Sequence, residues 1–320
     1  MNFQRIKSID IFRGLAIILM IFFTLLIRLS ITPDFLSHNV KGILHFGDFV
    51  LPMFLFASGL SLPFFVKKRK EKGTKEMILD IIEKLGKLTL ISVIITPFSA
   101  GGVLYMDEMM LNTILFLPAL LLTEQDEKLV LGLSVFILFS YFLLFPYMQT
   151  FFDQYYLGGY QGAIFYLPVM LGGVVVGKRI IKRRGFTDIL LVYATLNVAL
   201  LLMIFPDKMK GSPSFMTLSI VASLISLYVI SEINSRINSN IQVQKIFNFL
   251  EYCGRKPLRF WILLFLVFVI PLTFYVALKT NTFPLGINWK IGVLFSTFAI
   301  ICLYFVSKLI DKIEVWYQKT

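Results

Sequence analysis

Long apolar segments, most of about 17 residues or more, recur along this chain and are separated by short polar stretches. A helix that crosses a bilayer needs about 20 such residues, and its backbone hydrogen bonds must be satisfied internally. The segments lack the strict alternation of an outer-membrane barrel. Because 57% of the residues are hydrophobic and only 16% are charged, a soluble fold is excluded. The sequence predicts an all-α, polytopic membrane protein.

About ten spans are expected, which leaves no room for a soluble domain. We therefore treat residues 1–320 as a single transmembrane domain. The first span contains the acidic Asp10 and is followed by no small-residue cleavage pattern, so we expect it to remain in the mature protein. The expected spans are residues 9–31, 47–66, 84–101, 109–123, 128–148, 161–177, 187–206, 215–232, 258–278 and 287–309.

Basic residues outnumber acidic ones, 31 to 19, and they cluster beside the spans. This placement favours membrane topology and contact with anionic lipids over nucleic-acid binding. With both termini cytoplasmic, most of the cations fall inside, as the positive-inside rule requires for a protein of the cell membrane. The basic residues expected outside are Arg28, Lys41, Lys208, Lys210, Lys279 and Lys290.

Two charged residues open the first span. Asp10 and Arg13 are three positions apart, so they share one helix face. One interpretation is a self-neutralised pair near the headgroups, with Arg13 reaching toward water. The other is a pair that fixes the first helix or helps to bind an anionic ligand from the cytoplasm.

The only two histidines, His38 and His45, lie in the loop before Asp48 and the second span. The expected topology places this loop outside. Histidine is the side chain best suited to move a proton near neutral pH, and a carboxylate can orient an imidazole. The loop is therefore a candidate for chemistry. A metal site at His38, His45 and Asp48 is not favoured, because the spacing lacks helical i, i+4 geometry.

Two glycine-bearing stretches carry cations on the expected cytoplasmic side. The first ends the sixth span with Gly177, Lys178 and Arg179, and the second places Arg255 and Lys256 before Pro257. Each is either a helix end that follows the positive-inside rule or part of a vestibule for a phosphate-bearing ligand. The first is no P-loop, because it ends a helix instead of opening one.

The N-terminal motifs resemble the heparan-alpha-glucosaminide N-acetyltransferase family of multi-span acyltransferases. The resemblance rests on Ser8–Ala16, on His38, and on Asp48–Phe56 followed by Gly59. It is specific over about the first sixty residues. The later stretches, Leu167–Lys178 and Gly254–Leu258, match more loosely.

The resemblance implies acetyl transfer from cytoplasmic acetyl-CoA to a sugar or glycan on the far side of the membrane. Its catalytic histidine lies ten positions before the aspartate that opens the second span, which selects His38 and Asp48. The family has an active-site asparagine near the outer end of the first span, where this chain has Thr24; Asn39 is a second candidate for that role. Asp10, Arg13, Lys178, Arg179, Arg255 and Lys256 are the candidate ligands of acetyl-CoA.

The residues alone leave other functions open. A transporter or flippase of an anionic or lipid-linked substrate also uses intramembrane charges and broken helices. A non-catalytic relative is the third hypothesis, because Thr24 replaces the asparagine of the family. The sequence does not decide whether histidine acts as a general base or as an acyl relay. It also leaves open whether the protein forms a homodimer.

Overall fold

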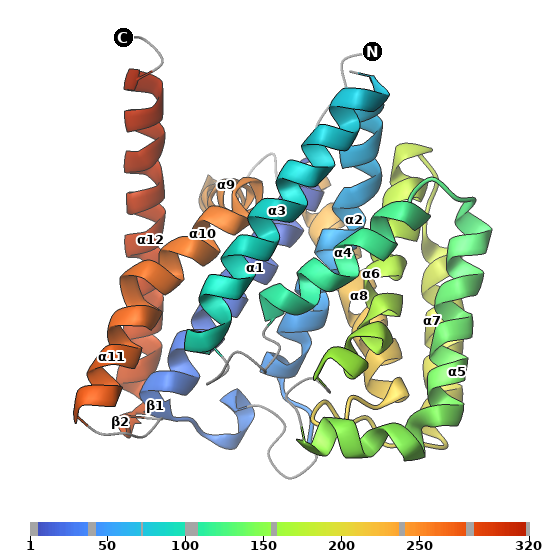
Figure 1. Cartoon of the computed structure of the whole chain (residues 1–320), viewed down its shortest axis with the longest axis horizontal. Helices are drawn as coiled ribbons and strands as arrows, with labels where there is room; N and C mark the ends of the chain where they lie inside the picture. Colours follow the sequence, from blue (N-terminus) through green and yellow to red (C-terminus); the bar gives the residue numbers. More distant parts are fainter. Residues whose placement is uncertain are drawn as a thin grey trace.

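The computed structural model describes residues 6–37, 43–71, 73–99, 108–154, 159–236, 241–279 and 285–317. These segments form a helical bundle (Figure 1). The helices are α1 (Lys7–Leu29), α2 (Val50–Lys70), α3 (Thr74–Ser99), α4 (Glu108–Leu122), α5 (Glu127–Gln154), α6 (Gly159–Ile181), α7 (Thr187–Leu201), α8 (Pro213–Arg236), α9 (Ile241–Arg255), α10 (Pro257–Leu264), α11 (Ile270–Lys279) and α12 (Trp289–Tyr317).

Short irregular elements connect some of these helices. Turns of 3₁₀ helix cover Asp34–Leu36 and Phe46–Phe49, and a π-helical turn at Phe265–Val269 joins α10 to α11. The only pairing of strands in the described residues is parallel, between β1 (Ser30–Ile31) and β2 (Ile287–Asn288). It ties the end of α1 to the start of α12, and the remaining regular structure of the described segments is helical, as predicted.

Among the described residues, seven helices are long and apolar enough to cross a membrane, which confirms a polytopic membrane protein. Three expected spans, 84–101, 109–123 and 187–206, are not among them. α4 and α7 have 15 residues each, or about 22 Å, whereas the hydrocarbon core is about 30 Å thick. α3 is long enough, with 26 residues, but it carries too many charged residues to count as an apolar span. The count of ten therefore stays a prediction.

The centre of the bundle is formed by α1, α2 and α6. The most apolar windows of these helices are 67%, 72% and 72% buried inside the protein, against 28% for α5 and α12. The sequence explains the contact between α2 and α6. Gly173 lies against the carbonyl of Phe56, and Gly59 against that of Met170, so small residues let the two backbones approach closely. The glycines of the sixth span thus serve helix packing.

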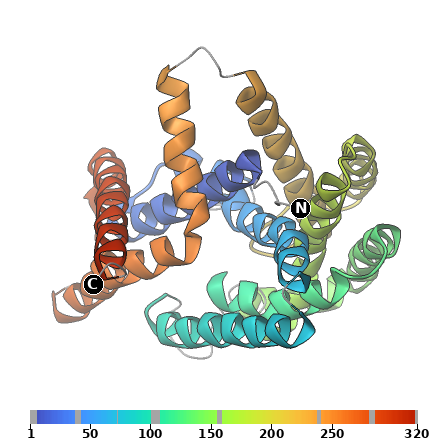
Figure 2. The ribbon, with the colours of Figure 1, turned by 90° about the horizontal axis from the view of Figure 1, so that it is seen from above.

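α9 differs from the other helices in direction. It is seen end-on in Figure 1 and lengthwise in Figure 2, so it lies across one end of the bundle. α1 begins and α12 ends toward this same end (Figure 1). α10 follows α9 after a break at Lys256 and has Pro257 in its first turn. The missing N–H of proline costs no hydrogen bond there, because the first N–H groups of a helix have no partner within it. α10 thus begins one residue before the start expected for the ninth span, residue 258.

Candidate active site

Asp48 lies in the 3₁₀ turn that leads into α2, and its side chain is fully buried. One carboxylate oxygen, Oδ2, accepts a hydrogen bond from the backbone N–H of His45 at 2.8 Å. The other, Oδ1, is 3.4 Å from Nζ of Lys208, whose side chain is only 5% exposed. A buried carboxylate needs such partners to stay charged. Lys208 was expected only as an outside cation, so sequence analysis missed this pair.

Lys208 belongs to the segment between α7 and α8 and is buried with Asp48. Burial lowers the pKa of its ammonium group, while the charge of Asp48 and, more weakly, that of Glu108 oppose the change. Two acidic groups from different elements therefore act on one buried lysine. No motif surrounds Lys208, so only the fold could reveal it.

The other predicted catalytic residues are less completely placed. His38 and Asn39 lie outside the described residues. Thr24 is half-buried on α1, where its carbonyl accepts a hydrogen bond from Arg28 at 3.3 Å. Nε2 of His45 is buried and has no hydrogen-bond partner in the described part of the chain.

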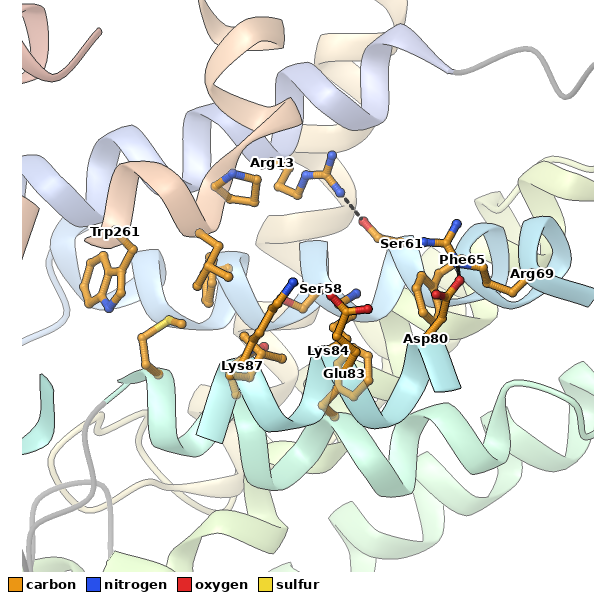
Figure 3. A pocket seen from close by; sticks show the side chains of 17 residues that line it. Arg13, Ser58, Ser61, Phe65, Arg69, Asp80, Glu83, Lys84, Lys87 and Trp261 are labelled. Atoms are coloured by element: carbon orange, nitrogen blue, oxygen red, sulfur yellow. Dashed lines mark hydrogen bonds and ion pairs between the residues drawn. The ribbon is translucent and has the colours of Figure 1, made fainter. Parts of the chain in front are cut away.

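A cavity of about 310 Å³ lies between α1, α2, α3, α4 and α10 (Figure 3). We call it the Arg13 cavity. The residues that α2 contributes follow each other at helical spacing along one face: Phe54, Ser58, Ser61, Phe65 and Arg69. The cavity therefore runs about 22 Å along α2. It begins one turn after the start of α2, close to the turn that holds Asp48.

Arg13 is held at this cavity by three elements. Its guanidinium pairs with Asp10 at 2.6 Å and donates to the hydroxyl of Ser61 at 3.0 Å. Nε donates to the carbonyl of Gly254 on α9. The predicted i, i+3 pair of Asp10 and Arg13 is thus present, and Arg13 also joins α1 to α2 and α9.

The lining of the cavity is cationic overall, with four basic side chains against two carboxylates. Arg69 pairs with Asp80, and Lys87 with Glu83. Nζ of Lys84 instead lies over two aromatic rings. It is 4.3 Å from the ring centre of Phe65 and 4.6 Å from that of Phe116, with no carboxylate within ion-pair distance among the described residues. The side chains of Lys84 and Lys87 point from α3 into the cavity, toward the side of Arg13 (Figure 3).

Two of the residues that line the cavity carry buried polar atoms that lack hydrogen bonds. Oδ1 of Asn112 and Nε1 of Trp261 are both buried and have no partner among the described residues. Asn112 is 5% exposed and Trp261 is 1% exposed. An unsatisfied acceptor and an unsatisfied donor beside a cavity can be satisfied by a ligand with amide groups.

The other predicted cations lie elsewhere and are already paired. Lys178 donates to the carbonyl of Gln125, and Arg179 pairs with Glu127 at 2.9 Å and with Asp188 at 2.8 Å. Arg255 pairs with Glu251, and Lys256 with Asp311. None of these four lines the Arg13 cavity. Of the predicted cations, the structure brings only Arg13 to it.

Sequence analysis missed the cations of α3, although a signal was present. Asp80, Glu83, Lys84 and Lys87 follow each other at the spacing of one helix face within an otherwise apolar segment. Charges placed in this way face protein or water instead of lipid. Such a stripe marks a polar cavity between helices.

The family model described as heparan-alpha-glucosaminide N-acetyltransferase, catalytic, matches residues 5–200. No curated protein matches the chain. The matched region includes Arg13, the loop of the histidines, Asp48 and the charged face of α3. Since the match covers more than half of the chain, the protein belongs to the heparan-alpha-glucosaminide N-acetyltransferase catalytic family.

Proposed function

We propose that this protein is a membrane acetyltransferase that moves an acetyl group from acetyl-CoA to a sugar or glycan on the opposite side of the membrane. The observation that carries the proposal is the course of the Arg13 cavity. It runs along α2 from a cationic end to within about one turn of the segment that holds Asp48. This course supports a common path for the donor and the proposed catalytic groups.

The residues of the cavity fit the chemistry of the donor. Phosphate groups prefer arginine and lysine, and Lys84 has no competing carboxylate among the described residues. The amide groups of the pantetheine arm match the unsatisfied oxygen of Asn112 and the indole N–H of Trp261. A volume of about 310 Å³ accommodates the acyl end and part of the arm, so the nucleotide would remain at the opening.

Acetyl transfer requires a base at the other end of the path. A nitrogen or oxygen of the acceptor attacks the thioester carbonyl, and its proton passes to His38. The C–S bond then breaks as His38 gives this proton to the sulfur, which releases CoA as the thiol. Asp48 orients His38 and stabilises its charged form. Asn39, Thr24 or a backbone N–H supplies a hydrogen bond to the oxyanion. Transfer through an acetylated histidine uses the same groups.

The proposed topology places both termini in the cytoplasm and the histidine loop outside, in a cell membrane crossed about ten times. Two observations support it. α1 begins and α12 ends toward the same end of the bundle (Figure 1), which an even number of crossings requires. The basic residues that end α2 and α6 fit the positive-inside rule.

The test uses purified full-length protein with labelled acetyl-CoA and a panel of amino sugars and glycans. We expect labelled product with the wild type, none with His38→Ala, and near-normal turnover with the matched control His45→Gln. Folding of each variant is checked by thermal unfolding in detergent. Undiminished turnover by a folded His38→Ala variant contradicts the proposed mechanism. Uptake of a substrate into proteoliposomes without acetyl-CoA, together with no transfer, would favour a transporter.

A further inference from the structure

We propose that Lys208 is a positioning residue for acetyl transfer, which acts through Asp48 by keeping that carboxylate charged and fixed. The inference rests on the proposed function, in which Asp48 works as a carboxylate. Lys208 lies beyond residues 5–200, the part of the chain that the family model matches. It adds a group from the α7–α8 segment to a site that the N-terminal motifs define.

The segment that carries Lys208 is tightly organised. The backbone N–H of Asp207 donates to the hydroxyl of Ser212 at 2.8 Å, and the backbone N–H of Ser212 donates to the carbonyl of Asp207 at 2.9 Å. Gly211 adopts a φ of 58°, a conformation that favours glycine. Its carbonyl accepts a hydrogen bond from the phenol of Tyr141 at 2.6 Å. These contacts hold the turn in place and so fix the position from which Lys208 reaches Asp48.

Burial of both charges makes the pair sensitive to the loss of either partner. The side chain of Asp48 is fully buried, and that of Lys208 is 5% exposed. A carboxyl group buried without a cation takes up a proton, because burial disfavours its charged form. The cation beside Oδ1 therefore favours the charged form of Asp48.

Other charged groups near the pair are few in the described part of the chain. Asp207 is adjacent to Lys208 in sequence, and Glu108 of α4 acts on Lys208 from a third element. His45 precedes Asp48 in the same turn and donates its backbone N–H to Oδ2. Neither Asp207 nor Glu108 can replace the positive charge that Lys208 brings to Asp48.

The principal experiment compares Lys208→Met, Lys208→Arg and the control Lys210→Met, which removes an exposed lysine from the same turn. Turnover and the KM for acetyl-CoA are measured across pH. With Lys208→Met, the acidic limb of the kcat profile should shift toward higher pH by about one to three pH units, while the KM for acetyl-CoA changes little. Lys208→Arg and Lys210→Met should keep the profile of the wild type. A uniform loss with an unmoved limb would show a structural role and overturn the proposal.

A second measurement does not depend on activity. In Lys208→Met, the buried Asp48 has lost the cation beside Oδ1, so we expect the folded protein to bind a proton that the unfolded chain releases. Its thermal stability should therefore fall, relative to the wild type, as pH rises from about 5 to about 8. The double variant Asp48→Asn, Lys208→Met should lose this dependence. Identical pH dependence in the wild type and in Lys208→Met would overturn the proposal.

The double variant also covers the case in which Lys208→Met is not recovered as folded protein. It leaves no buried charge without a partner, so it should fold, yet it should not transfer acetyl groups. Wild-type turnover by this variant would overturn the inference. A wild-type protein that transfers no acetyl group would instead overturn the proposed function, and the stability measurement would still report on the pair.

Discussion

Gly14 of α1 and Gly254 of α9 meet backbone to backbone where the two helices cross. A Cβ atom on Gly254 would overlap the carbonyl oxygen of Asp10, and one on Gly14 would overlap that of Leu250. This close approach also lets the carbonyl of Gly254 accept a hydrogen bond from Arg13. The crossing therefore positions the guanidinium group at the cavity.

Substitution of Gly254 by alanine should disturb the crossing. Because backbone atoms block the added methyl group, we expect a loss of about 1–3 kcal/mol in the free energy of unfolding, measured by denaturant titration in detergent. The matched control is Gly132→Ala on α5, where a Cβ meets no atom within 4 Å. If the two variants are equally stable, the backbone contact does not constrain the fold.

Arg13→Lys should fail to replace the arginine. The planar guanidinium reaches Asp10, Ser61 and the carbonyl of Gly254 at once, whereas an ammonium group has no fork geometry. Arg13→Gln removes the cation that lies 2.6 Å from the buried carboxylate of Asp10 and should lower the free energy of unfolding. We expect Arg13→Lys to be more stable than Arg13→Gln but to show a raised KM for acetyl-CoA. Wild-type KM in the lysine variant would separate Arg13 from donor binding.

Tyr252 should make stability depend on alkaline pH. Burial, with the nearby Asp311, raises the pKa of its phenol to about 12, while the unfolded value is about 10. Between these values the unfolded chain has lost a proton that the folded protein keeps, so stability is complete below pH 10 and falls as pH rises toward 12. Thermal unfolding of the wild type and of Tyr252→Phe at pH 9, 10 and 11 tests this. Parallel curves for the two proteins would contradict it.

Hydropathy and short motifs predicted much of this architecture. The seven described helices that are long and apolar enough to cross a membrane coincide with expected spans, and α10 starts at Pro257, next to the expected start at residue 258. Asp10 and Arg13 form a pair because residues three positions apart lie on the same face of a helix. Such features depend only on helix geometry and on the surrounding lipid, so they can be predicted from the sequence.

Partners from distant segments were not predictable in this way. The pairing of Lys208 with Asp48 joins residues 160 positions apart, and nothing local distinguishes Lys208 from Lys210. The cations Lys256 and Arg179 match a phosphate site by sequence, yet Asp311, Glu127 and Asp188 neutralise them in the fold. Which charges remain available to a ligand depends on tertiary pairing.

Lys84 and Lys256 allow a direct test of which cations bind the donor, because Lys84 belongs to the cavity and Lys256 was predicted from the sequence. Lys84 lines the Arg13 cavity without a carboxylate partner among the described residues, whereas Lys256 pairs with Asp311 outside it. We expect Lys84→Met to raise the KM for acetyl-CoA about tenfold or more with kcat less affected, because a charged hydrogen bond to phosphate is worth about 1.5–3 kcal/mol. Lys256→Met should leave KM within about twofold while lowering stability. If Lys256→Met raises KM more than Lys84→Met does, the donor binds at the α9–α10 junction and not in the Arg13 cavity.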